Sequence, residues 1–120
     1  MDKRDKGLQG MDQKEAIAIA KKYIRFLVKN NFDVTKAYLF GSYTKGSFNE
    51  NSDIDLAVVI HGLQDAFDTH VELMKLRRKI DTRIEPHLFD ESDFDMTHPM
   101  ASEILKNGIE INALQADKSE

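Results

Sequence analysis

The sequence predicts an α/β domain in which a small mixed β-sheet is flanked by helices. Three observations support this prediction: residues 12–30 repeat apolar side chains at helical spacing, residues 37–40 and 54–60 are short apolar stretches, and a second helical pattern separates these from a third strand over residues 80–89. The expected order is helix, strand, helical turn, strand, helix, strand, helix, which is typical of layered α/β proteins.

The composition favours one soluble domain of the ordinary globular kind. The chain has 120 residues, of which 41% are hydrophobic and 32% are charged. It contains no Cys, so disulfides and thiolate metal sites are excluded, and metal ligands must come from oxygen or imidazole groups. No apolar run reaches the roughly 18 residues that a membrane helix needs, and residues 1–10 lack the apolar core of a signal peptide. We therefore expect a cytoplasmic protein without membrane contact.

The charge balance argues against direct binding of nucleic acid. The net charge is −4 and the pI is about 5.6, whereas proteins that hold nucleic acid carry a basic surface. One basic cluster exists, and it lies late in a predicted helix, where cations stabilise the helix dipole; its members are Lys75, Arg77, Arg78 and Lys79.

The chain divides into a folded domain and two polar ends. Residues 1–11 show no periodicity and are expected to form a disordered lead, residues 12–112 form the domain, and residues 113–120 are expected to form a flexible tail. The domain opens with an amphipathic helix, for which Asp12 is the predicted N-cap and Glu15 completes a capping box.

The predicted strands differ in how deeply they are buried. Residues 37–40 are apolar and aromatic and end at Gly41, so they form a buried strand that leads into a turn. Residues 54–60 become uniformly apolar, which indicates a central strand. The third strand, residues 80–89, contains Pro86, which indicates a sheet edge or a bulge.

Two further helices follow from periodicity and from terminal signals. Phe67, Val71 and Met74 recur at helical spacing before the third strand. The last helix is expected to begin near Pro99 and to end at Gly108, which suits a left-handed position after the helix.

Two carboxylates, Asp53 and Asp55, mark the start of the second strand. Residues two apart on a strand project from one face about 6.6 Å apart, so these like charges point the same way. That arrangement is costly in an apolar strand unless solvent or a cation neutralises it, and oxygen ligands favour Mg²⁺ or Mn²⁺. A capped junction between a loop and a strand has the same tripeptide, so the pair alone does not define a site.

The turn after the first strand carries groups that could bind a phosphate. Gly41 lets backbone N–H groups approach a phosphate, Ser42 adds a hydroxyl donor, and residues 43–45 begin a helical turn with unpaired N–H groups. Lys45 is either a phosphate ligand or a solvated side chain. A Gly-Ser turn is common by itself, but next to a carboxylate pair it indicates a nucleotide site.

The combined pattern resembles the nucleotidyltransferase superfamily related to DNA polymerase beta, in particular its minimal nucleotidyltransferase group. The motif of that superfamily is Gly-Ser, a spacer, and Asp-x-Asp in a strand. Here Gly41-Ser42 is followed, after ten residues, by Asp53-Ile54-Asp55. The elements from about Lys14 to Phe94 follow the family order, so the resemblance covers most of the chain and implies a nucleotidyltransferase fold.

The resemblance also implies the chemistry and the site residues. Asp53 and Asp55 match the catalytic ligands of Mg²⁺ or Mn²⁺, and Gly41 and Ser42 match the residues that hold the phosphates of ATP or another nucleoside triphosphate. The family uses a third carboxylate, on a neighbouring strand, that binds one metal ion and activates the nucleophile.

The third carboxylate has two candidates on one predicted face of the third strand. Asp81 and Glu85 are four residues or about 13 Å apart, so only one can join the pair. Glu85 is preferred because its distance to Phe94 fits the family better and because Asp81 can end the preceding helix. Arg83 and His87 share this face and are further candidates for substrate contact.

Members of the minimal group are commonly encoded beside a helical HEPN-family partner, as antitoxin and toxin. The leading hypothesis is therefore transfer of AMP from ATP to a hydroxyl of that partner. One alternative is transfer to a small molecule such as an aminoglycoside, for which so short a chain needs an acceptor pocket completed by a homodimer. The other is an antitoxin that acts by binding alone, against which the intact motif argues.

Overall fold

The computed structural model describes residues 12–46 and 52–112, so the expected lead and tail lie outside the described residues. Within this part, four strands form one sheet in the order β3-β2-β1-β4. The strand β2 pairs in parallel with β3 and antiparallel with β1, and β1 pairs antiparallel with β4. The predicted mixed sheet is confirmed. The bounds are β1 Val34–Phe40, β2 Ile54–Ile60, β3 Ile84–Asp90 and β4 Ile109–Glu110.

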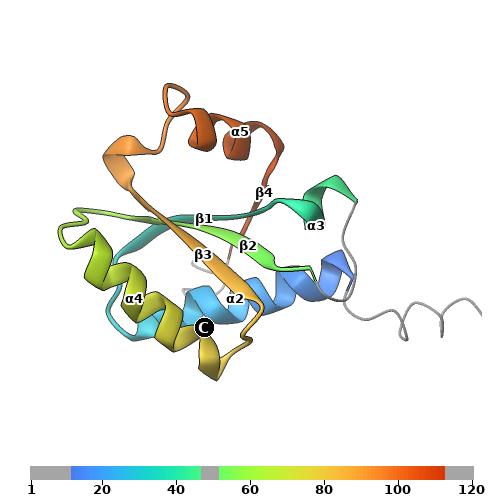
Figure 1. Cartoon of the computed structure of the whole chain (residues 1–120), viewed down its shortest axis with the longest axis horizontal. Coiled ribbons are helices and arrows are strands. Elements are labelled where there is room, and N and C mark those ends of the chain that lie inside the picture. Colours follow the sequence, from blue (N-terminus) through green and yellow to red (C-terminus); the bar gives the residue numbers. More distant parts are fainter. Residues whose placement is uncertain (1–11, 47–51, 113–120) are drawn as a thin grey trace, which may run out of the picture.

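Helices cover the two faces of the sheet unequally (Figure 1). Helices α2 and α4 lie on one face, and α5 lies on the other. No helix in the described ranges combines the length and the apolar character that a membrane crossing requires. The α-helical bounds are α2 Gln13–Lys29, α3 Ser42–Lys45, α4 Ala66–Leu76 and α5 Pro99–Asn107, with 3₁₀ turns η1 Arg77–Lys79 and η2 Glu91–Asp93.

Helix α2 begins where the sequence predicts. The Asp12 carboxylate accepts the Glu15 N–H at 3.0 Å, and the Glu15 carboxylate accepts the Asp12 N–H at 3.2 Å, which completes the capping box. The Tyr23 hydroxyl of α2 donates to the carbonyl of Leu73 in α4 at 2.8 Å, and burial raises the pKa of Tyr23. This hydrogen bond joins the two helices that cover the same face.

The core is divided between the two faces of the sheet. On β2, Leu56 and Val58 pack in the cluster that includes the buried side of α2, while Ala57 and Val59 pack in a smaller cluster with residues of α5. We call these the closed face and the open face. The alternation along β2 follows from the pleat, which sends successive side chains to opposite faces. All four side chains are fully buried, so β2 is central, as the sequence predicts.

The third strand begins later than predicted, at Ile84. The N–H groups of Ile80 and Asp81 both donate to the Arg77 carbonyl, at 2.9 and 2.8 Å, and the Asp81 carboxylate accepts the Arg83 N–H at 2.9 Å. These bonds hold residues 80–83 in a turn, so the expectation that Asp81 lies on the strand was wrong. Pro86 indicated either a sheet edge or a bulge. The sheet edge is confirmed, because β3 is an edge strand whose register against β2 is continuous.

Two other expectations need correction. Gly108 has φ −80° and ψ 168°, not a left-handed conformation. Glycine is required there because a Cβ would come within 2.7 Å of the Ile104 carbonyl oxygen, and the chain continues directly into β4, which the sequence did not predict. Phe67, assigned to the buried stripe of α4, is 79% exposed, while Leu73 is the residue that α4 buries completely.

Candidate functional site

Gly41 and Asp55 lie against each other where β1 ends and β2 begins. Phe40, the last residue of β1, pairs in register with Asp55. Gly41 follows with φ 81° and ψ −146°, a conformation that is essentially restricted to glycine. A Cβ on Gly41 would also collide with Oδ2 of Asp55. Both the backbone conformation and the carboxylate therefore require glycine at this position.

The short helix α3 holds the other predicted phosphate ligands. Ser42 is its first residue and is half-buried, and Lys45 is its last and is exposed. The helix is fixed to the rest of the domain by the buried ring of Tyr43 and by the Gln13 side chain, which donates to the Tyr43 carbonyl at 2.8 Å. Ser42 is thus placed directly after Gly41, with Lys45 one turn further on.

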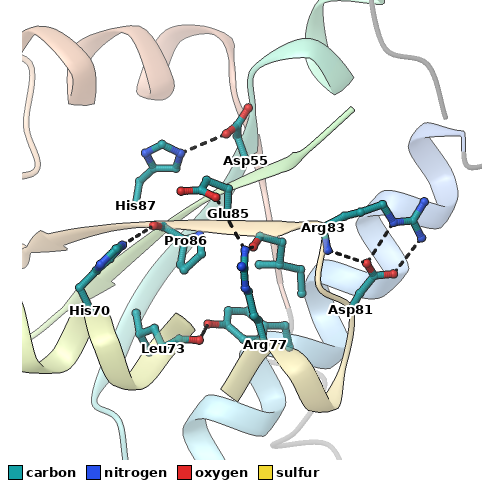
Figure 2. A network of polar contacts seen from close by, with 11 residues as sticks. Asp55, His70, Leu73, Arg77, Asp81, Arg83, Glu85, Pro86 and His87 are labelled. Atoms are coloured by element: carbon teal, nitrogen blue, oxygen red, sulfur yellow. Dashed lines mark hydrogen bonds and ion pairs between the residues drawn. The ribbon is translucent and has the colours of Figure 1, made fainter. Parts of the chain in front are cut away.

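Asp55 lies on the open face, and the neighbouring strand β3 supplies a hydrogen bond to it. His87 Nε2 lies 3.1 Å from Asp55 Oδ1 (Figure 2). The His87 ring also packs edge-on against Phe40, with 4.9 Å between ring centroids. His87 pairs in register with Ala57, whose small side chain leaves room for the imidazole. One Asp55 oxygen therefore faces His87 and the other faces Gly41. Asp53, which precedes β2, is exposed.

Glu85 is the candidate carboxylate that lies beside Asp55. The two residues pair in register across the parallel strands β2 and β3, which directs their side chains to the same face. Arg77 reaches the edge of β3, where Nη1 donates to the Ile84 carbonyl at 2.8 Å and lies 3.7 Å from Glu85 Oε1 (Figure 2).

Asp81 has a different environment from Glu85. Its carboxylate accepts two hydrogen bonds from the Arg83 guanidinium, at 3.0 and 2.8 Å (Figure 2). The hydrogen bonds from Arg83 hold the pKa of the Asp81 carboxyl below its ordinary value. Both residues belong to the turn that precedes β3, and they pair with each other there. The prediction that Asp81 and Arg83 lie on the same strand face as His87 was therefore wrong.

The carboxylates suit a hard divalent cation by their donor chemistry. No three side chains in the described ranges converge as a ready-made metal cage. Mg²⁺ is commonly held by only one or two carboxylates together with substrate phosphates and water. Asp53 and Asp55, with Glu85 beside them, supply such oxygen donors next to the Gly41 turn. The donor set is therefore of the kind that binds Mg²⁺ together with phosphate.

Two surface hollows are lined by residues that neighbour Asp55, one on the β1 side and one on the β3 side, and both reach Met100 of α5. The Gly41 hollow, about 420 Å³, is lined by Phe40, Gly41 and Lys45 together with residues of α5. The β3 hollow, about 630 Å³, is lined by residues of β3, of α4 and of the segment from η2 into α5, among them Phe67, His70, Glu85, His87, Asp93 and Met100.

Sequence reasoning did not foresee the β3 hollow. The expectation was that so short a chain lacks an acceptor pocket of its own. His70 lies half-buried in the hollow, with Nε2 3.3 Å from the Pro86 carbonyl oxygen. The lining comes from helices far apart in the chain, and no local pattern joins them.

Solved structures resemble this chain in fold. A protein from Sulfolobus solfataricus that is assigned as a nucleotidyltransferase superposes with a TM-score of 0.61 at 20% identity, covering 82% of this chain and 80% of that one. A toxin-antitoxin structure with AMP-PNP gives 0.57 at 28% identity, with coverages of 82% and 77%. A chain from the complex of tri-AMPylated Shewanella oneidensis HEPN toxin with MNT antitoxin gives 0.53 at 24%, with coverages of 86% and 77%.

Sequence comparison gives the family. No curated protein matches the chain significantly. Residues 21–116, however, match the family described as polymerase beta, nucleotidyltransferase. This range includes the Gly41-Ser42 turn, both aspartates and all four strands. With its mixed sheet and with the glycine turn packed on Asp55, the chain belongs to the polymerase beta nucleotidyltransferase family.

Proposed function

We propose that this protein transfers AMP from ATP to a hydroxyl group of a HEPN-family protein partner and so acts as the antitoxin of a toxin-antitoxin pair. The observation that carries the proposal is the arrangement around Asp55 of β2, which lies against Gly41 at the end of β1 and pairs in register with Glu85 of β3. The 28% identical toxin-antitoxin structure with AMP-PNP supports the choice of an adenine nucleotide and of a toxin-antitoxin pair.

The triphosphate binds at the turn after β1. Gly41 has no side chain, so the backbone comes close to the phosphates, and Ser42 donates its hydroxyl to them. Lys45, exposed at the end of α3, pairs with a terminal phosphate. Asp53 and Asp55 hold Mg²⁺ or Mn²⁺, which when bound neutralises charge on the phosphates and lowers the pKa of the attacking hydroxyl.

Glu85 accepts the proton of the acceptor hydroxyl. The hydroxyl oxygen attacks the α-phosphorus, the bond from that phosphorus to the bridging oxygen breaks, and pyrophosphate leaves from the Gly41 side. Arg77 holds Glu85 at the edge of β3 through the ion pair between Nη1 and Oε1, at 3.7 Å. His87 orients Asp55 through the hydrogen bond to Oδ1.

The test is incubation with α-labelled ATP, Mg²⁺ and the product of the neighbouring gene. We expect label on that protein, and we expect Asp53→Ala and Asp55→Ala each to abolish it. If the Asp53→Ala/Asp55→Ala protein neutralises the partner as well as the unmodified protein does, the antitoxin acts by binding and the proposal is wrong.

Two matched variants test the third carboxylate. Glu85→Gln removes the base next to Asp55 and is expected to abolish transfer, whereas Asp81→Asn changes only the turn with Arg83 and is expected to keep most of it. The reverse result would assign the role to Asp81. An aminoglycoside in place of the protein partner tests the alternative acceptor class, and labelling of the small molecule alone would establish it.

A further inference from the structure

We propose that the β3 hollow is the acceptor site and that it selects a partner segment carrying apolar and basic side chains next to the reacting hydroxyl. This inference rests on the proposed function and adds the place and the chemical character of acceptor recognition. It is carried by three properties of the hollow: its position relative to Asp55, its charge and its exposed apolar side chains.

The position follows from the order of the strands. Asp55 on β2 lies between β1, which leads to Gly41, and β3, which carries Glu85. The Gly41 hollow therefore opens on one side of Asp55 and the β3 hollow on the other. Attacking and leaving oxygens lie roughly in line through the transferred phosphorus. With pyrophosphate leaving toward Gly41, the acceptor approaches from the β3 hollow, where Glu85 forms part of the wall.

The charges of the two hollows favour the same assignment. The Gly41 hollow is lined by Lys45 and one carboxylate, Glu103, whereas the β3 hollow has three carboxylates and no lysine or arginine among the described residues that line it. One carboxylate, Asp90, already accepts the Leu63 N–H at 2.7 Å and the Ser92 N–H at 3.0 Å. Asp93 and Glu85, the latter also 3.7 Å from Arg77, are the carboxylates that face an occupant. They repel a triphosphate and attract a basic segment.

Apolar side chains complete the hollow. In the described ranges the large hydrophobic side chains that stay exposed are Phe67, Met96 and Met100, at 79%, 55% and 40%. Phe67 and Met100 line the β3 hollow, one from α4 and one from α5. Exposed aromatic and methionine side chains around a recess are typical of contact sites for a partner. A volume of about 630 Å³ suits a few side chains of one segment.

The experiment separates binding of the acceptor from binding of ATP. Steady-state transfer is measured against the neighbouring-gene protein with Phe67→Ser and Asp93→Asn, because Met100 lines both hollows and would not separate them. For each variant we expect the KM for the protein partner to rise about tenfold, with the KM for ATP unchanged. Met96→Ser is the control, since Met96 is an exposed hydrophobic residue that does not line the hollow. Urea unfolding midpoints should stay constant because these side chains are exposed.

Each of the other possible results contradicts a different part of the proposal. A raised KM for ATP with an unchanged KM for the partner would assign the hollow to the nucleoside. Unchanged constants for both variants would place the acceptor elsewhere and leave the proposed function intact. If the unmodified protein labels no partner at all, the proposed function itself is wrong, and the acceptor site with it.

Discussion

The closed and open faces are built from the same strands but differ in content: the closed face holds the larger apolar cluster, and the open face carries the candidate site. On the closed face, Leu56 and Val58 are fully buried in one cluster with residues of α2 and α4. On the open face, Ala57 and Val59 are buried beside residues of α5, but Asp55 remains half-buried, and its neighbours line two hollows. The difference teaches that the pleat of a single strand separates stability from chemistry, because one face of β2 is entirely apolar and the other also carries a carboxylate.

The largest effect should follow from a cavity on the closed face. Leu56→Ala removes a fully buried side chain and is expected to lower the free energy of unfolding by about 2–5 kcal/mol, measured by urea titration. Leu105→Ala is the matched change on the open face. Leu105 is only partly buried, so we expect about 1–2 kcal/mol. Equal losses would mean that the two faces contribute alike to stability.

The next effect should appear in catalysis. Gly41→Ala pushes a Cβ into the Asp55 carboxylate, and a displaced site residue lowers the rate by at least about 100-fold. The measurement is the transfer rate at saturating ATP and Mg²⁺.

Gly46→Ala is the control for backbone strain. Gly46 also has a positive φ, 75°, but a Cβ there meets nothing within 4 Å. We expect it to cost about 1 kcal/mol of stability while transfer stays close to that of the unmodified protein. A similar loss of transfer in both variants would show that strain, not the contact with Asp55, makes Gly41 necessary.

A smaller effect is expected for the hydrogen bond that orients Asp55. His87→Leu removes the donor and should lower transfer by about tenfold and raise the Mg²⁺ concentration that half-saturates the rate. His87→Gln keeps an N–H donor at a similar reach and should restore most of the loss. If the leucine variant shows an unchanged Mg²⁺ dependence, His87 has no part in positioning Asp55.

The smallest effect concerns the turn before β3. The hydrogen bonds with Arg83 lower the pKa of Asp81. The stabilisation from this pair is therefore fully present at a pH above the ordinary carboxyl pKa, and it is lost as the pH falls through the lowered pKa of Asp81. Asp81→Asn should therefore reduce the free energy of unfolding at pH 7 by less than about 1 kcal/mol. This difference should disappear once the pH is below the lowered pKa of Asp81. The double variant Asp81→Asn/Arg83→Gln should cost no more than the sum of its parts, and a difference that persists in acid would contradict the pairing.

Local signals explain which parts of the fold could be predicted. Helix α2 was predictable because Asp12 and Glu15 form a capping box within one turn. The strand β2 was predictable because residues 54–60 form an apolar run. The two residues of β4 carry no such signal. They pair with β1 directly after Gly108, where a Cβ would meet the carbonyl oxygens of Ile104 and Leu39.

The candidate site, too, could be predicted only where local sequence signals determine the structure. The neighbouring positions of Asp55 and Glu85 follow from strand periodicity once β2 and β3 are known to run in parallel. The start of β3, by contrast, depends on side-chain bonds of Asp81 that periodicity does not report. The β3 hollow needs α4 and α5 on either side of one strand, which is a property of the packed molecule.

The outer edge of β3 has a consequence for how the protein avoids self-association. An exposed edge strand offers its peptide groups to another chain, and edge-to-edge pairing leads to aggregation. Here Pro86 has no N–H to offer, its carbonyl lies 3.3 Å from His70 Nε2, and the Ile84 carbonyl accepts a hydrogen bond from Arg77. Successive acceptors along this edge are covered by side chains of the preceding helical segment. A second sheet therefore cannot extend this one through Ile84 and Pro86, which protects the protein against fibre-like growth from that edge.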